Sequence, residues 1–352
     1  MNGRNELKRA MFYSSSKDGT VTCKLCPRNC TIPLGSRGAC RVRENRGGEL
    51  YSLVYGKPVS MSPDPIEKKP LFHFHPGSCA FSIATVGCNL FCKHCQNWEI
   101  SQASPEDFPV EDVPPEDVVR KALQLGCHGI AYTYTEPTVF YEYVYDVSAI
   151  AKKEGLYNVL VTNGYISEDA LREISRFIDG LNIDVKSIES NFYSEICGAK
   201  SNDAVLNSVE VSFELGMHVE VTNLIIPGKN DSVSSIRRLC RWLLGISDEI
   251  PIHFTRFYPH YKLRDLDPTP VETLEKAREI ALEEGMKFVY IGNVLGHEWE
   301  NTFCPNCGRV VIKRFGFSVS EINLVDKKCK FCGERIPIRG EIHSPYKGPD
   351  IY

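Results

Sequence analysis

The stretch "GCNLFCKHCQN", residues 87–97, decides the fold, because it places three cysteines at intervals of four and three residues and then stops. A tetrahedral zinc site or a fully ligated iron–sulfur cluster normally has four protein ligands. A cluster held by three thiolates has one iron free to bind a small molecule. A zinc knuckle would instead need a remote fourth ligand, for which His73, His75 and His94 are candidates. Whether a protein side chain fills the fourth coordination position therefore distinguishes a structural site from a reactive centre.

The composition sets the broad class of the protein. A chain of 352 residues suggests two or three domains, and its formal charge of −4 argues against a nucleic-acid binder. The N-terminal residues contain no apolar signal region, and no apolar run approaches the roughly 18 residues that indicate a membrane helix. We therefore expect a soluble, cytoplasmic protein that binds neither membranes nor nucleic acid.

Two further cysteine clusters flank the central one. The absence of an export signal favours metal or cluster ligation over disulfides for the 15 cysteines of the chain. The N-terminal cluster, C-x2-C-x3-C-x9-C, could hold zinc or an auxiliary [4Fe–4S] cluster and comprises Cys23, Cys26, Cys30 and Cys40. The C-terminal cluster, C-x2-C-x21-C-x2-C, comprises Cys304, Cys307, Cys329 and Cys332. It predicts a zinc ribbon, with a rubredoxin-like single iron as the alternative.

The four remaining cysteines are scattered through the chain. They are Cys79, Cys127, Cys197 and Cys240. We interpret them as small buried hydrophobic residues and assign them no role.

Helical and β-rich segments alternate between the central and C-terminal cysteine clusters. Predicted helices end in glycine, which adopts a left-handed C-cap without penalty, at Gly126, Gly155, Gly216 and Gly285. Seven segments are predicted strands: 78–87, 128–135, 157–163, 181–187, 218–226, 251–259 and 287–294. Such alternation predicts a parallel sheet whose chemistry lies at the carboxyl ends of its strands.

The number of units and the ends of the chain define the domains. Residues 79–294 are fewer than the roughly 250 of a complete eight-unit barrel, so we expect an α/β fold with a partial (β/α)6-type parallel barrel. Residues 61–295 form this barrel, 1–60 an N-terminal Cys-rich metal or cluster module, and 296–352 a C-terminal four-Cys module. The segment "TPVETLEKA" further predicts a helix with Thr269 as its N-cap and Glu272 closing a capping box.

The motif C-x3-C-x2-C after the first strand of a partial barrel resembles the signature of radical S-adenosylmethionine (SAM) enzymes. Segments of the later strand ends are similar to those of pyruvate formate-lyase activating enzymes: "YTYTEPT" at 132–138, "VTNGY" at 161–165, "IDVKS" at 183–187 and "LIIPGKND" at 224–231. The wider string at 68–101 resembles the radical SAM enzymes of the AmmeMemoRadiSam system. The sequence differs from these enzymes at two positions. His94 stands where they usually carry an aromatic residue near adenine, and Val161 stands where they carry an aspartate of a monovalent cation site.

The resemblance implies a mechanism and a set of site residues. Cys88, Cys92 and Cys95 would bind a [4Fe–4S] cluster whose open iron is chelated by SAM. An electron from a flavodoxin- or ferredoxin-type donor would release methionine and a 5′-deoxyadenosyl radical, which abstracts hydrogen from an unidentified protein or small-molecule substrate. The residues expected to bind the cofactor are His94, Thr135, Glu136, Asn163, Asp184 and Lys186. Memo-like and AMMECR-like proteins are the partners that the family implies.

Alternatives remain open at this point. The chain could be an activase that installs a glycyl radical on a partner enzyme, or a non-enzymatic metal-binding scaffold. Glu136 could merely cap the helix that follows it, and Asp184 and Lys186 could form a simple ion pair.

Overall fold

The computed structural model describes residues 7–343, in which eight strands form one central sheet. They pair in the order β13-β12-β11-β10-β9-β8-β7-β6. Strands β7 to β13 run parallel, and β6 is antiparallel to β7. The bounds are β6 (Ser60–Pro65), β7 (Cys79–Ala84), β8 (Gly129–Tyr132), β9 (Tyr157–Thr162), β10 (Gly180–Asp184), β11 (His218–Ile225), β12 (Ile252–Arg256) and β13 (Val289–Gly292). The seven predicted strands and the parallel α/β architecture are therefore confirmed.

The edge strand β6 was not among the predicted strands. Its sequence, SMSPDP, has no apolar alternation and contains Pro63 and Pro65, which cannot donate a hydrogen bond to a neighbouring strand. An edge strand tolerates proline because only one of its sides is paired, here with β7. Pairing with β7 therefore forms a strand that periodicity does not reveal.

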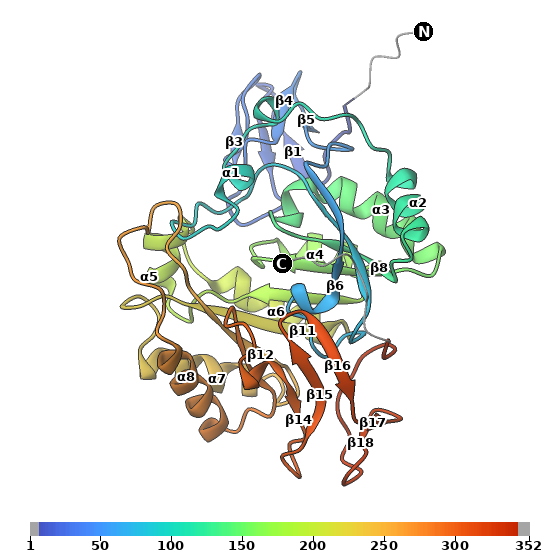
Figure 1. Cartoon of the computed structure of the whole chain (residues 1–352). Helices are drawn as coiled ribbons and strands as arrows, with labels where there is room; N and C mark the ends of the chain where they lie inside the picture. The colour runs from blue at the N-terminus through green and yellow to red at the C-terminus, as the bar shows by residue number, and fades with distance from the viewer. Residues whose placement is uncertain (1–6, 344–352) are drawn as a thin grey trace.

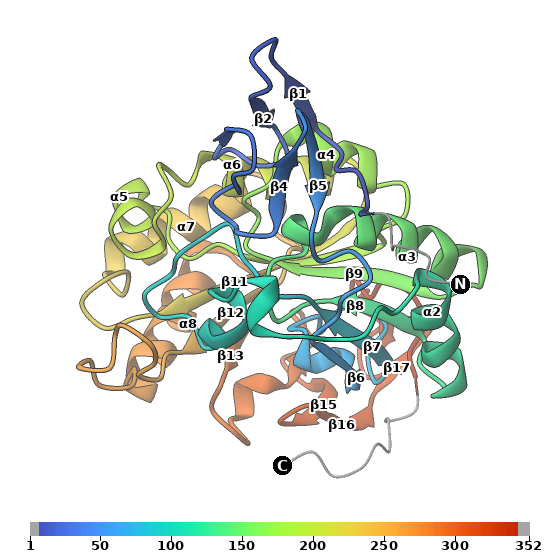
Figure 2. The same cartoon turned by 90° about the horizontal axis from the view of Figure 1, so that it is seen from above.

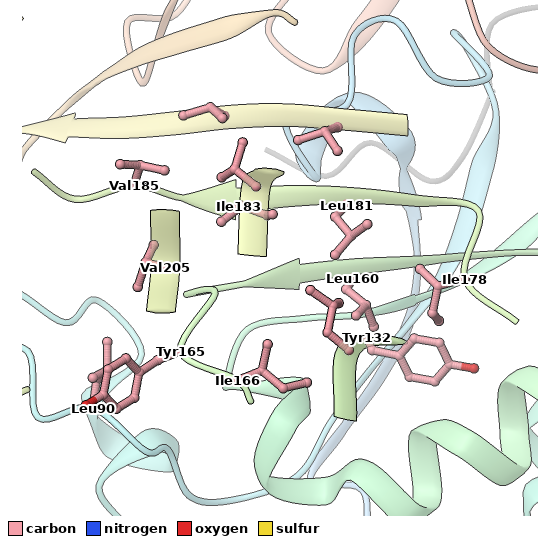
Figure 3. Close-up of a cluster of buried hydrophobic side chains, with 14 of the residues drawn as sticks. Leu90, Tyr132, Leu160, Tyr165, Ile166, Ile178, Leu181, Ile183, Val185 and Val205 are labelled. Atoms are coloured by element: carbon pink, nitrogen blue, oxygen red, sulfur yellow. The ribbon is translucent and has the colours of Figure 1, made fainter. Parts of the chain in front are cut away.

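Helices cover the outer face of the sheet. Helices α2 and α3 lie over the part with β8 and β9, and α7 and α8 lie over the part with β12 and β13 (Figure 1). Their bounds are α1 (Trp98–Ser101), α2 (Pro115–Gln124), α3 (Tyr141–Lys153), α4 (Glu168–Ile174), α5 (Ser190–Phe192), α6 (Asp203–Glu214), α7 (Val233–Leu244) and α8 (Val271–Glu284). Figure 3 shows Ile183 and Val185 on the same side of β10 as Val205 of α6, within the main hydrophobic core. Because side chains alternate along a strand, Asp184 faces the opposite side of the sheet, and Lys186, beyond the end of β10, forms an ion pair with it.

Helix termini match the sequence analysis at one end and differ at the other. The predicted C-terminal glycines all have positive φ angles, 67° at Gly126, 77° at Gly155, 75° at Gly216 and 109° at Gly285. The predicted cap at Thr269 is wrong, since Pro270 is the N-cap of α8 and no capping box forms. The Thr269 hydroxyl instead donates to the Ile225 carbonyl (2.6 Å) and accepts the Phe257 N–H (3.1 Å). It thereby joins the ends of β11 and β12.

Two small modules lie on opposite sides of the sheet, as both Figure 1 and Figure 2 show. The N-terminal module contains β1 (Tyr13–Ser15), β2 (Val21–Cys23), β3 (Thr31–Ile32), β4 (Arg43–Arg46) and β5 (Glu49–Ser52). The C-terminal module contains β14 (Thr302–Phe303), β15 (Val310–Phe315), β16 (Ser318–Ile322), β17 (Leu324–Val325) and β18 (Lys328–Cys329). The predicted boundaries at residues 60 and 296 stay predictions.

The modules are packed differently against the barrel. Val42 and Leu50 of the N-terminal module belong to the same core as the barrel residues around Leu90. The C-terminal module packs in a separate, smaller core that it shares with the barrel, in which Val311 and Ile312 contact Phe72 and Tyr290. Within residues 7–343, the structure contains no helix with the length and apolarity needed to cross a membrane.

Candidate active site

The three central cysteines lie on the loop that connects β7 to α1, at the carboxyl edge of the parallel strands. Cys92 is buried, whereas Cys88 and Cys95 are partly exposed. Hydrogen-bond donors surround their sulfurs: the Leu90 N–H donates to Cys88 Sγ (3.4 Å), and Ser101 Oγ lies 3.2 Å from Cys95 Sγ. Such contacts, together with burial, are the means by which a protein tunes an iron–sulfur cluster.

The spacing of these sulfurs suits a cluster better than a single ion. A single metal ion needs several ligand atoms close together. Among the His, Cys, Asp and Glu side chains of residues 7–343, three or more ligand atoms lie within 4.8 Å of one another only in the C-terminal cysteine cluster. The sulfurs of Cys88, Cys92 and Cys95 are spread more widely. In a cubane cluster each thiolate binds a different iron atom, so a wider arrangement is what the group requires. The cysteines of this loop therefore fit a [4Fe–4S] cluster.

The histidines considered as a fourth zinc ligand are engaged elsewhere or lack a metal-like setting. His73 Nε2 lies 2.6 Å from the Tyr290 hydroxyl, and His75 Nδ1 lies 3.2 Å from His343 Nε2. The ring of His94 is buried with Nδ1 unpartnered. Burial, reinforced by the charge of Lys186, lowers the pKa of His94 to about 3, so the ring is neutral at physiological pH. No ring nitrogen of these histidines gathers with two of the central cysteine sulfurs as a single zinc ion requires, which disfavours the zinc-knuckle interpretation.

Glu136 and Asn163 connect the ends of β8 and β9 to the cysteine loop. Glu136 caps the short helix η3 (Pro137–Phe140) by accepting the Thr138 N–H, and its second oxygen accepts the Asn163 N–H (2.8 Å). The Asn163 side-chain amide lies 3.6 Å from Cys88 Sγ and donates to Asn89 Oδ1 (3.0 Å). Burial raises the pKa of Glu136 although several donors point at it. Glu136 is thus placed to fix Asn163 beside Cys88.

Asp184 and Lys186, at the end of β10, form an ion pair of 2.8 Å. The Lys186 side chain is 12% exposed and that of Asp184 is 38% exposed, so the pair opens toward solvent on the aspartate side. Burial alone lowers the pKa of Lys186, but the charges of Asp184 and Cys92 outweigh it and raise the pKa above its ordinary value. A permanent cation therefore lies close to the cysteine loop.

Thr135 is placed between two strand ends. Its hydroxyl donates to the Thr85 carbonyl (2.8 Å), and the side chain is almost fully buried. This bond ties the end of β8 to the residue after β7. The structure thus brings Thr135, like Glu136 and Asn163, to the edge of the sheet that carries the cysteines.

Two residues near the cysteine loop were missed by the sequence analysis. Asn89 joins Cys88 to Asn163 and also donates to the Tyr165 carbonyl (2.6 Å). Cys197, at the end of the π-helical segment Tyr193–Cys197, hydrogen-bonds with Cys92, and this contact lowers the pKa of the Cys92 thiol. Cys197 is buried as predicted, but its position beside Cys92 has no signal in the sequence.

The C-terminal cysteines form a compact four-thiol site. Cys304 Sγ lies 3.5 Å from Cys332 Sγ, and Cys307 Sγ lies 3.7 Å from Cys329 Sγ. Thiolates held about 2.3 Å from a tetrahedral metal have sulfurs about 3.8 Å apart. The site therefore fits one tetrahedrally coordinated ion and leaves no position open for chemistry.

A parallel α/β sheet with three cysteines on the loop after its first parallel strand defines the radical SAM class. The radical SAM superfamily profile matches residues 82–243. The middle of the chain is therefore a radical SAM domain.

Relatives extend the comparison over most of the chain. The chain is 49% identical over 335 residues to Uncharacterized protein MJ0808 of Methanocaldococcus jannaschii, which covers 94% of this chain and 99% of that protein. It is 24% identical over 223 residues to the pyruvate formate-lyase-activating enzyme of Clostridium pasteurianum, covering 57% of this chain and 87% of the enzyme. The solved domain of a pyruvate-formate lyase-activating enzyme from Bacteroides vulgatus has a TM-score of 0.41 and 19% identity, covering 47% of this chain and 99% of that domain.

Proposed function

We propose that this chain binds a [4Fe–4S] cluster through Cys88, Cys92 and Cys95, cleaves SAM reductively and abstracts hydrogen from a substrate held at the carboxyl edge of the sheet. One observation carries the proposal. The cysteine loop follows β7, and side chains from the ends of β8, β9 and β10 converge on it. When bound, the cluster supplies one electron to the sulfonium of SAM, which yields methionine and a 5′-deoxyadenosyl radical.

The residues of this chain orient the cofactors and set the local charge. The Asn163 amide, held by Glu136, points at Cys88 Sγ, where a hydrogen bond to the sulfur favours its thiolate form. Lys186 supplies a cation for the carboxylate of SAM, and the neutral ring of His94 suits stacking against adenine. Burial of these side chains excludes water from the place where the radical would form.

The substrate is identified by isotope transfer. Anaerobically reconstituted protein is reduced with SAM and deuterated candidate substrates, and 5′-deoxyadenosine is analysed by mass spectrometry. Deuterium in 5′-deoxyadenosine identifies the hydrogen donor. Absence of SAM cleavage by the reconstituted and reduced protein would instead support the non-enzymatic scaffold.

Activation of a glycyl-radical enzyme is the second candidate function. It is supported by the similarity to pyruvate formate-lyase-activating enzymes and, at 24% identity over 221 residues, to a putative glycyl-radical enzyme activating enzyme of Methanocaldococcus jannaschii. Incubation with a candidate partner enzyme and SAM, followed by electron paramagnetic resonance (EPR), tests this function. A glycyl-radical doublet on the partner supports it, and deuterium transfer from another substrate without a doublet contradicts it.

The Memo-like and AMMECR-like partners rest on the resemblance of residues 68–101 to enzymes of the AmmeMemoRadiSam system, and the electron donor rests on the low potential that reductive SAM cleavage needs. A flavodoxin- or ferredoxin-type protein would supply the electron, and Memo-like and AMMECR-like proteins would act with the enzyme. Co-purification and stimulation of SAM cleavage by each purified protein test these assignments. The C-terminal cysteines would bind zinc, because a closed four-thiolate site suits a structural ion.

A further inference from the structure

We propose that Cys23, Cys26, Cys30 and Cys40 bind a second [4Fe–4S] cluster, enclosed between the N-terminal module and the cysteine loop of the active site. Zinc and an auxiliary cluster are both compatible with the spacing of these cysteines in the sequence. Three structural observations decide between them: the pocket that the cysteines line, the spread of their sulfurs, and two buried N–H groups of the Arg43 guanidinium that have no partner.

All four N-terminal cysteines line one pocket between the N-terminal module and the cysteine loop. Much of the remaining wall is apolar and includes Leu25, Ile32 and Val139. The Ala39 N–H donates to Cys30 Sγ (3.5 Å), which is the kind of backbone contact that stabilises a thiolate ligand. A largely apolar pocket lined by four thiols has the donor set for a fully ligated cluster.

The sulfurs of this pocket are arranged differently from those of the C-terminal site. The C-terminal ligand atoms all lie within 4.8 Å of one another, whereas no three of the N-terminal sulfurs meet this condition. A single tetrahedral ion requires sulfurs about 3.8 Å apart. A cubane spreads its four thiolates because each one binds a separate iron atom. The described part of the chain therefore contains one four-cysteine site with the sulfur spacing of a single ion and one whose sulfurs are spread more widely, as a cluster requires.

The Arg43 side chain indicates that the pocket takes an anionic group. Arg43 lines the pocket and is 2% exposed. Its Nη2 is paired with Glu142, but its Nε and Nη1 groups are buried without a hydrogen-bond partner. Buried donors of this kind are costly unless something accepts from them. An iron–sulfur core with four thiolates is anionic, and its sulfurs accept N–H hydrogen bonds.

The pocket adjoins the active-site loop. Asn89, which lines the pocket, also accepts a hydrogen bond from Asn163 beside Cys88. Gly87 is in direct contact with the backbone of Cys40, since a Cβ atom at Gly87 would lie 3.0 Å from the Cys40 carbonyl oxygen. Four protein ligands leave no iron open to SAM, so electron storage or transfer is the chemistry available to this cluster.

The variant Cys88→Ala/Cys92→Ala/Cys95→Ala isolates the N-terminal site in the full chain. After anaerobic reconstitution with iron and sulfide, we expect about four acid-labile sulfides per chain and the Mössbauer signature of a [4Fe–4S] cluster, against about eight sulfides in the wild type. The sulfide content is more decisive than the iron content, because a single iron in the C-terminal site would add iron but no sulfide. A triple variant that holds zinc at the N-terminal site and no sulfide would overturn the proposal.

A second comparison covers the case in which the triple variant does not fold. Cys26→Ala in the otherwise wild-type chain should reduce the sulfide count from about eight to about four, while the matched Cys307→Ala leaves it at about eight. An unchanged sulfide count in folded Cys26→Ala contradicts the proposal. The proposal does not depend on SAM cleavage, because its readout is the cluster content and not turnover.

Discussion

Gly87 lies against Cys40, with no space for a side chain between them. A Cβ atom at Gly87 would meet Val42 Cγ1 at 2.7 Å and the Cys40 carbonyl oxygen at 3.0 Å. The residue that precedes the first active-site cysteine is thus packed against the last cysteine of the N-terminal cluster. The two cysteine-rich segments form one continuous structure although they are separated along the chain.

The first prediction concerns this contact. Gly87 has a φ of 97°, so Gly87→Ala combines backbone strain with a clash and should lower the free energy of unfolding by about 2–4 kcal/mol. Gly126→Ala is the matched control, because Gly126 has a φ of 67° and nothing within 4 Å of the added Cβ. Its cost should be about 1 kcal/mol. Anaerobic urea unfolding measures both, and equal costs would show that the Gly87 contact is absent.

The second prediction concerns Lys186 in the cofactor pocket. Lys186→Ala should weaken SAM binding about tenfold, equivalent to about 1.4 kcal/mol, because it removes a buried cation near Cys92. The iron and sulfide content should not change, since Lys186 ligates no metal. Isothermal titration with SAM provides the measurement, and Lys152→Ala on the surface of α3 is the control. An unchanged affinity would mean that Lys186 serves only its ion pair with Asp184.

The third prediction concerns the metal of the C-terminal module. Cys329→Ser should release the C-terminal ion and make residues 296–343 sensitive to protease, because this small module has few core residues of its own. Metal analysis should find zinc in the wild type, and the control Cys240→Ser should retain it. Redox-active iron in this site, or loss of metal without increased proteolysis, would contradict a structural role.

The fourth prediction concerns the dependence of stability on pH. Burial lowers the pKa of His73 to about 3, so the folded state keeps the ring neutral while the unfolded chain takes up a proton below about pH 6.5. The free energy of unfolding should therefore fall as the pH is lowered from 6.5 toward 3. By pH 5 the loss due to His73 should reach about 2 kcal/mol.

The comparison of His73→Gln with the wild type measures this contribution. Glutamine keeps a polar atom near the Tyr290 hydroxyl but does not titrate. Urea unfolding at pH 7.5 and pH 5 should show a smaller loss of stability in His73→Gln than in the wild type. His260→Gln, at a less buried position, should behave like the wild type. Equal losses in His73→Gln and the wild type would contradict the prediction.

The seven parallel strands could be predicted from the sequence because each one is an apolar run that follows a glycine or a turn. The glycines that end the helices could also be predicted, because a positive φ angle is a local property of the residue. Strand β6 was not predicted, because its prolines interrupt the apolar alternation of a strand and its conformation depends on pairing with β7. Thr269 was assigned wrongly because tertiary contacts with Ile225 and Phe257 take the hydroxyl that a local cap would use.

Part of the candidate site could be predicted from the sequence, because some of its residues belong to local sequence patterns. The cysteines and the strand-end residues stand in recognisable local patterns. The contact of Asn89 with Asn163 and that of Cys197 with Cys92 join positions far apart in the chain, so no local pattern reports them. The partner hydrogen bonds of Glu136 also depend on the fold, because they connect the end of β8 to that of β9.

The central claim is that Cys88, Cys92 and Cys95 hold the cluster that cleaves SAM. The most direct test is to measure 5′-deoxyadenosine by mass spectrometry after anaerobic reconstitution, reduction with dithionite and addition of SAM. We expect the wild type to form 5′-deoxyadenosine and methionine, and the triple alanine variant to form neither while its fold, followed by circular dichroism, is retained. Formation of 5′-deoxyadenosine by the folded triple variant at the wild-type rate would contradict the account.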